Sequence, residues 1–133
     1  WHRMAFGHAE SAMERRFPWG DQDPVPGVHG NFGFAREGPA PVNAFPSGSS
    51  AFGVQGLYGD GWELTASEFL PLEGFCAMPE YANYSADFFD GEHFVLKGAS
   101  WATHPTLIRR SFRNWYQDHY RYVFSKFRLV RDV

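Results

Sequence analysis

Aromatic rings and arginines are interleaved through residues 98–129, and this mixture is suited to ligand binding. Arg113, Asn114 and Trp115 are consecutive, and Arg121 follows in the same segment. Aromatic side chains form the walls of ligand pockets, and a guanidinium group holds a carboxylate through two parallel hydrogen bonds. The segment is therefore typical of a site for a small polar ligand that carries a carboxylate. Cation–π packing on a twisted surface is the alternative explanation of the same pattern.

The composition indicates one compact domain rich in loops. The chain has 133 residues, of which 44% are hydrophobic and 19% are aromatic, and it contains 14 Gly and 9 Pro. That combination favours short strands joined by irregular loops over a helical bundle. A net charge of −3 provides no general attraction for nucleic acid or for an anionic membrane surface, so neither is expected as a partner.

Cysteine use and hydropathy indicate where such a chain works. Cys76 is the only cysteine, so no internal disulfide can form, and the reducing cytoplasm is the expected location. Its neighbours Phe75 and Ala77 predict that Cys76 is buried as a small hydrophobic residue. No apolar run in the sequence approaches the roughly 18 residues of a membrane-spanning helix.

Glycine and proline divide the chain into short elements. Apolar spacing predicts a helix within 1–16, weakened by Gly7. Alternation of apolar and polar side chains predicts that a strand begins near Trp62. The other predicted elements are a tight turn at 17–21, an ordered loop at 22–50, a long loop at 68–91, a strand at 93–97 and a final strand at 124–130. A loop as long as 68–91 inside a compact domain usually has a function.

Five short motifs follow one another in an order that resembles a known family. They are FPWGD at 17–21, APV at 40–42, GLYGDGWELT at 56–65, KGASW at 97–101 and FRL at 127–129. The order resembles the C-terminal part of the formylglycine-generating-enzyme (sulfatase-modifying factor) domain, whose pattern runs YPWG, APV, GLYDMxGNVWEWT, RGGSW and GFR. The resemblance implies an α+β fold of the C-type-lectin-like kind, with short twisted strands. It also implies that 1–133 is the C-terminal portion of such a domain, whose N-terminal part is absent.

Within that superfamily the chain is most similar to the sulfoxide synthases of ergothioneine biosynthesis. The segments that carry this similarity are YSADFFDG at 84–91, WATHP at 101–105, SFRNW at 111–115 and HYRYVF at 119–124. The resemblance implies an oxidoreductase that uses non-haem Fe(II) and O2 to join a thiol, cysteine or γ-glutamylcysteine, to C2 of hercynine. It places the iron ligands in an N-terminal helical domain that is absent from this chain, which alone would be inactive. Thr103 and Ile108 fall near the places where formylglycine-generating enzymes carry redox cysteines, which argues against that chemistry here.

The resemblance also implies substrate-binding residues. Asn114 and Trp115 would line the hercynine pocket, where the Trp ring attracts a trimethylammonium group and the amide holds a carboxylate or a water. Tyr116 stands where members that use γ-glutamylcysteine have Asp, which points to free cysteine or a related thiol as the donor. Arg113 and Arg121 are the candidates to clamp the carboxylate of the thiol substrate. The structural alternative is that Trp115 belongs to the core and that Asn114 caps a turn.

Two tyrosines in the long loop are the candidate catalytic residues. Tyr81 and Tyr84 are three residues apart. A phenol can donate a proton or an electron during oxygen chemistry while its ring packs against neighbours. The alternative is that both rings simply cover a core.

Metal binding is expected to be limited in this chain. The six histidines are scattered without the spacing of an iron site, so no iron ligand is predicted here. Asn31, Gly59, Gly61 and Glu63 resemble positions that bind structural calcium in the wider superfamily, where loop carbonyls and a carboxylate suit Ca²⁺. The alternative is that Glu63 makes buried hydrogen bonds to loops.

Two other functional interpretations remain open from the sequence. One is a related synthase that forms C–S or C–Se bonds on hercynine or histidine, of the selenoneine or ovothiol kind. The other is a non-catalytic binding module with the same fold.

Overall fold

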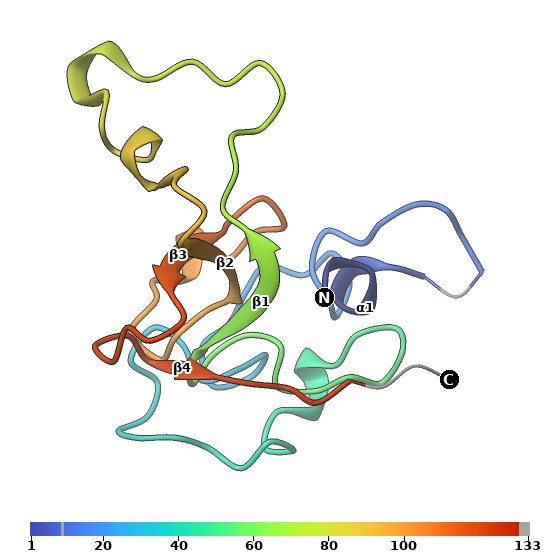
Figure 1. Ribbon diagram of the computed structural model, residues 1–133. Helices are drawn as coiled ribbons and strands as arrows, with labels where there is room; N and C mark the ends of the chain where they lie inside the picture. The colour runs from blue at the N-terminus through green and yellow to red at the C-terminus, as the bar shows by residue number, and fades with distance from the viewer. Residues whose placement is uncertain (9, 131–133) are drawn as a thin grey trace.

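A computed structural model describes residues 1–8 and 10–130 (Figure 1). It has few helical turns, short strands and long irregular connections, which confirms the predicted α+β architecture. The end of the predicted domain, 131–133, lies outside the described residues. In chain order the elements are α1 (His2–Phe6), η1 (Pro46–Gly48), β1 (Trp62–Glu68), η2 (Pro79–Tyr81), η3 (Ala86–Phe88), β2 (His93–Gly98), η4 (Pro105–Leu107), β3 (Asn114–Gln117) and β4 (Ser125–Lys126), where η denotes a 3-10 turn.

The strands form one mixed sheet in the order β3-β2-β1-β4. β2 pairs antiparallel with both β1 and β3, whereas β4 runs parallel to β1. The predicted strands near Trp62 and at 93–97 are confirmed as β1 and β2. Gly98 ends β2 with a φ of 88°, and a Cβ there would lie 2.5 Å from the Leu57 carbonyl oxygen, so only glycine fits.

The two outer strands differ from the prediction. β3 was not foreseen, because all four of its residues are half-buried and show no alternation of apolar and polar positions. The final strand is limited to Ser125–Lys126 instead of 124–130. The pairing of β1 with β2 is irregular between Leu64 and Glu68. β4 pairs with β1 only at Trp62 and Glu63, and Phe127, which follows it, is 83% exposed.

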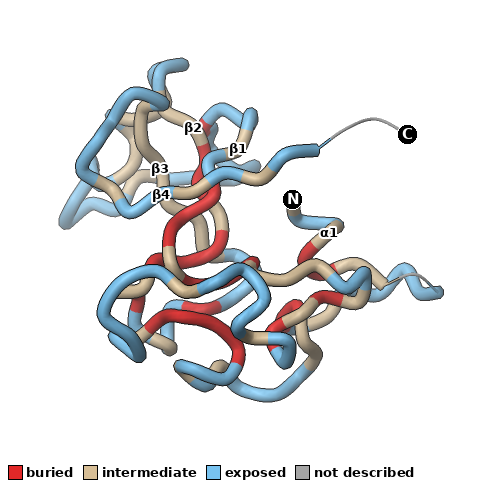
Figure 2. The backbone as a smooth tube through the Cα atoms, turned by 90° about the horizontal axis from the view of Figure 1, so that it is seen from below, coloured by how far each residue is buried: buried red, intermediate tan, exposed pale blue. Residues whose placement is uncertain are grey.

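The main core lies between α1 and the loops beneath the sheet, where the buried stretches gather in Figure 2. Its buried members are Ala5, Phe6, Phe17, Phe32, Leu57, Tyr58, Ala99 and Ile108. The helix predicted within 1–16 extends only from His2 to Phe6, and position 9 lies outside the described residues. It ends because Gly7 takes an extended conformation, in which a Cβ would lie 2.5 Å from the Arg3 carbonyl oxygen. The predicted turn at 17–21 is confirmed, since Phe17 and Gly20 exchange backbone hydrogen bonds of 2.9 and 3.1 Å.

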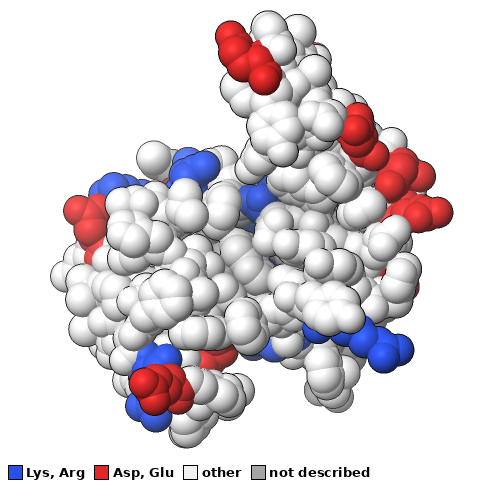
Figure 3. Space-filling model, turned by 90° about the vertical axis from the view of Figure 1, so that its left-hand side faces the viewer, with Lys and Arg blue, Asp and Glu red and all other residues white. Residues whose placement is uncertain are grey.

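The loop between β1 and β2, residues 69–92, projects from the sheet and is called the arm below (Figure 1). It contains η2 and η3 and carries five acidic residues but no Lys or Arg, and acidic groups mark its end in Figure 3. Cys76 is exposed, so the prediction that it is buried was wrong. The reason is that the arm extends away from the core, so an apolar local sequence there has little to pack against. Within the described residues, the structure contains no helix with the length and apolar character needed to cross a membrane.

Candidate functional site

Trp115 lies at the centre of an aromatic cluster where the arm leaves the sheet. β3 presents its side chain, which stacks on Phe69 with ring centroids 4.4 Å apart and planes 10° apart. Tyr84 approaches the indole edge-on at 5.7 Å, and Phe88 lies 5.8 Å away. Phe69 is only 2% exposed and its backbone N–H donates to His93 O at 2.8 Å, so it fixes the base of the arm. Trp115 itself is half-buried.

The arm brings the two candidate catalytic tyrosines to this cluster. Tyr81 ends η2, and the Tyr84 backbone N–H donates to Tyr81 O at 3.1 Å. Their ring centroids are 5.3 Å apart, and each side chain is 54% exposed. Tyr84 therefore contacts Trp115 directly, and Tyr81 contacts Tyr84. Both phenol groups are accessible from solvent.

Arg113 is part of the same cluster but is already engaged. Its guanidinium lies 4.6 Å from the Phe69 ring centroid and donates to Leu70 O at 3.1 Å. Burial lowers the pKa of Arg113, although an arginine remains charged at any physiological pH. Arg113 thus holds the beginning of the arm. A substrate carboxylate would bind to the guanidinium N–H groups that do not donate to Leu70 O.

The other predicted binding residues lie apart from Trp115. Side chains alternate along a strand, so Asn114 and Tyr116 point to the opposite face of the sheet from Trp115. Asn114 Oδ1 accepts the Trp115 backbone N–H at 3.0 Å, and Tyr116 stacks on Tyr120 at 4.8 Å. Arg121 is exposed in the turn after β3, without a hydrogen bond or ion pair to the rest of the described chain. The structure therefore unites Trp115, Arg113 and the tyrosines, and separates Asn114, Tyr116 and Arg121 from them.

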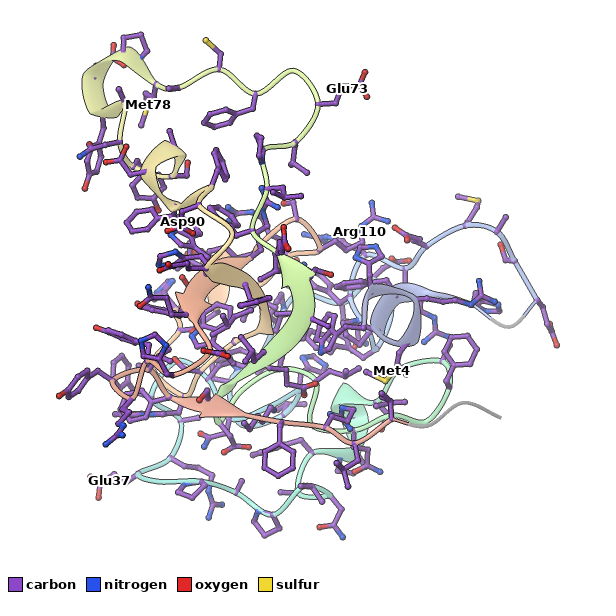
Figure 4. All side chains as sticks on the ribbon, in the orientation of Figure 1. Met4, Glu37, Glu73, Met78, Asp90 and Arg110 are labelled. Atoms are coloured by element: carbon purple, nitrogen blue, oxygen red, sulfur yellow. The ribbon has the colours of Figure 1, made fainter. Side chains whose placement is uncertain are left out.

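Sequence reasoning missed Phe69, Phe88 and His93 as parts of this site. The Phe88 ring lies 5.1 Å from His93, whose Nδ1 is 2.8 Å from an Asp90 carboxylate oxygen. The hydrogen bond with His93 lowers the pKa of Asp90. Figure 4 shows Asp90 at the base of the arm, far from Glu73 and Met78 near its tip. The sequence signal that could have identified these residues is the Phe residues at the two ends of the arm. Rings at the ends of the arm lie near the sheet, where they can contact β3.

The described residues do not form an iron site by themselves. Across residues 1–8 and 10–130, His, Cys, Asp and Glu side chains form no group of three or more that could hold a metal ion.

The predicted calcium residues make other contacts. Glu63 is 2% exposed and accepts hydrogen bonds from the Trp1 indole at 2.8 Å and from Arg128 Nη2 at 2.9 Å. Gly59 O accepts from Lys126 Nζ at 3.0 Å. Two of the predicted groups are thus already in contact with cationic side chains of the chain itself, Glu63 with Arg128 and Gly59 O with Lys126.

The two other residues of that predicted set make separate contacts. Asn31 is fully buried, and its Nδ2 donates to Asp60 Oδ1 at 2.7 Å and to Gly38 O at 3.0 Å. Its Oδ1 is buried without a hydrogen-bond partner among the described residues. Gly61 packs against the backbone of 124–126, where a Cβ would lie 3.0 Å from Phe124 O. Its backbone N–H donates to Gly59 O at 2.8 Å.

Two hollows lie away from Trp115. One, of about 420 Å³, is lined by Arg16, Arg109 and Arg110 together with Phe17, Thr106, Ile108 and Ser111. The other, of about 370 Å³, has Trp101, Phe124, Asp60 and Lys126 among its lining residues. Neither includes the aromatic cluster, which is an open surface at the base of the arm.

Comparison with known proteins identifies relatives over the whole chain. Residues 3–133 match the family described as sulfatase-modifying factor enzyme 1-like domain. Over 133 residues the chain is 40% identical to a hercynine oxygenase of Mycobacterium tuberculosis, covering 100% of this chain and 31% of that protein. It is 42% identical over 137 residues to a hercynine oxygenase of Mycolicibacterium smegmatis, covering 100% of this chain and 32% of that protein.

A fungal protein shows the same relationship. The chain is 44% identical over 104 residues to ergothioneine biosynthesis protein 1 of Neurospora crassa, which covers 77% of this chain and 12% of that protein. The chain thus spans about a third of the length of the two hercynine oxygenases and a smaller share of the fungal protein.

Proposed function

The chain belongs to the sulfatase-modifying factor enzyme 1-like domain family, and we propose that it supplies part of the substrate site of a hercynine-oxidising sulfoxide synthase. In this proposal the full-length protein uses non-haem Fe(II) and O2 to join a thiol sulfur to C2 of hercynine. The support is identity of 40% and 42% to two proteins named hercynine oxygenase over the whole of this chain.

The single observation that carries the proposal is the contact between the arm and β3 at Trp115. A partly exposed indole attracts a trimethylammonium group through cation–π interaction, worth about 0.5–2 kcal/mol. Phe69 stacks on one side of this indole, so a ligand would meet the remaining ring surface and Tyr84. Half-buried aromatic surface beside two accessible phenols suits a zwitterionic, trimethylated amino acid better than an extended polymer.

We assign distinct roles to the residues of this surface. Trp115 binds the trimethylammonium group, and Tyr84 and Tyr81 supply a phenol proton beside it. Asn114, Tyr116 and Arg121 lie apart from this surface, since Asn114 and Tyr116 point to the other face of β3, and they would contact a different part of the bound substrates, with Arg121 binding a carboxylate. Iron, when bound, would supply the oxygen activation. Its ligands would come from a helical domain in the rest of the full-length protein, of which this chain is the C-terminal portion.

The proposed thiol donor is free cysteine. Tyr116 stacks on Tyr120 with planes 13° apart, which makes this side of β3 aromatic instead of acidic. An aromatic pair has no carboxylate that could form an ion pair with the ammonium on the γ-glutamyl part of γ-glutamylcysteine. A smaller donor is therefore the better match.

The test is an assay of the full-length protein with Fe(II), O2, hercynine and either cysteine or γ-glutamylcysteine. We expect hercynine-dependent O2 consumption and a sulfoxide product identified by mass spectrometry, with cysteine preferred. Tyr84→Phe should change the product or slow its formation, whereas Tyr122→Phe, which removes a hydroxyl from a side chain 87% exposed, should not. Hercynine binding without O2 consumption would instead indicate a binding module.

A further inference from the structure

Three oxygen atoms surround the side-chain ammonium of Lys126 beneath β1. Nζ donates to Gly59 O at 3.0 Å and also to Gly56 O, and it lies 3.7 Å from Glu63 Oε1. The Lys126 side chain is 26% exposed and that of Glu63 only 3%. Two loop carbonyls and a buried carboxylate are the hard oxygen donors that proteins use for inorganic cations.

The negative charge within this group is fully matched by the chain. Arg128 donates to both carboxylate oxygens of Glu63, at 2.9 and 3.2 Å, and Trp1 donates to one of them at 2.8 Å. Burial lowers the pKa of Lys126, while the charges of Glu63 and Asp60 oppose that shift. A second, inorganic cation would meet two positive groups, the Lys126 ammonium and the Arg128 guanidinium.

The backbone around Lys126 is built for close approach. A Cβ at Gly61 would be crowded, since it would lie 3.0 Å from Phe124 O and 3.2 Å from Lys126 N. β4 can therefore lie directly on the start of β1, where Ser125 pairs with Trp62 and Lys126 pairs with Glu63. From this position the four-carbon side chain reaches the Gly56 and Gly59 carbonyls.

The sequence places a lysine where the related motif GFR has glycine, since Lys126 precedes Phe127 and Arg128. We propose that the ammonium of Lys126 takes the place of an inorganic cation in this oxygen cage, so that the chain carries its own cation where calcium would otherwise bind. A tethered ammonium is present at every calcium concentration. It also connects β4, which has only two residues, to the loop before β1. This inference does not depend on the enzymatic proposal above.

Two substitutions test it in the full-length protein. Lys126→Gly removes the ammonium and opens the cage, whereas Lys126→Met removes the charge but fills the same space. Melting temperatures would be measured after EDTA treatment and in about 5 mM CaCl2, with MgCl2 as a further comparison. We expect wild type to melt at one temperature in both conditions. Lys126→Gly should melt lower and recover by about 3 °C or more with CaCl2, because a ligand that binds only the folded state stabilises it.

The controls decide whether the cage is responsible. Lys126→Met should melt lower than wild type without recovery in CaCl2, and Glu63→Gln combined with Lys126→Gly should abolish the recovery. A folded Lys126→Gly protein whose melting temperature does not change with CaCl2 would overturn the inference. If neither Lys126 variant folds, the wild-type protein is measured with and without CaCl2. A rise in its melting temperature that depends on CaCl2 and that Glu63→Gln removes would overturn the inference. An unchanged melting temperature would support it.

Discussion

Removing Arg128 should destabilise the protein far more than removing an arginine from an equally short surface pair. In the buried pair, Arg128 Nη2 is 2.9 Å from Glu63 Oε1, and the Glu63 side chain is 3% exposed. In the surface pair, Arg16 Nη2 is 2.8 Å from Asp23 Oδ1, but the side chains are 59% and 79% exposed. The two distances are nearly equal, so the pairs differ in burial and in the second hydrogen bond, at 3.2 Å, that Arg128 makes to Glu63.

The expected magnitudes follow from what each carboxylate retains. Removing one partner of a buried pair costs about 3–5 kcal/mol because the other charge is left uncompensated. Glu63 would keep the Trp1 indole at 2.8 Å and Lys126 at 3.7 Å, so we expect Arg128→Met to cost about 2–4 kcal/mol. Arg16→Met should cost about 0–1 kcal/mol, since water solvates both groups of an exposed pair.

The assay is unfolding of the full-length protein, followed by both heat and urea. In a domain of 133 residues a loss of 2–4 kcal/mol corresponds to a fall in melting temperature of about 10 °C, and the fall is smaller in a longer protein that unfolds as one unit. Hydrogen exchange of the β1 peptide would show whether the loss is local to Glu63, because its amides should exchange faster in Arg128→Met. Equal effects of the two substitutions, or β1 exchange that does not change, would refute the reasoning that burial makes this pair strong.

Four further predictions address other parts of the molecule. Burial lowers the pKa of His29 from its ordinary value of 6.5, so the stability contributed by the neutral imidazole should be complete above about pH 6.5. It should fall as the pH decreases from 6.5 toward the folded-state pKa. The melting temperature of His29→Asn should depend less on pH over that range. Gly98→Ala should cost about 1–3 kcal/mol in urea denaturation, because it forces a Cβ to within 2.5 Å of the Leu57 carbonyl oxygen at a φ of 88°. Trp115→Ala should lower kcat/KM for hercynine by roughly 2–30-fold through the lost cation–π attraction, measured by O2 consumption. Cys76 is exposed and should react with a maleimide in the native protein as fast as in a urea-unfolded sample, and slow labelling would show that the arm is covered.

Local chemistry made part of the fold predictable. The turn at 17–21 follows from proline and glycine, which restrict the backbone whatever surrounds them. The start of β1 at Trp62 and the position of β2 follow from alternation along a few residues. The fold class and the sulfatase-modifying factor likeness were also readable, because short motifs keep their order along the chain.

Other features were decided by contacts between distant segments. β3 is a strand because β2 offers its free edge to Asn114–Gln117, although those residues alone show no strand pattern. Cys76 is exposed for a related reason, since its apolar neighbours are carried outward by the arm.

The candidate site shows the same division. Sequence alone named Trp115, Tyr81 and Tyr84 as separate candidates, and the amino-acid types were enough to state what chemistry each can do. Only the tertiary structure set Tyr84 against Trp115, turned Asn114 to the other face and delivered Lys126 to the Glu63 carboxylate. Side-chain chemistry is a property of each residue, but a contact between positions thirty or sixty apart depends on the path of the chain between them, and no local periodicity records that path.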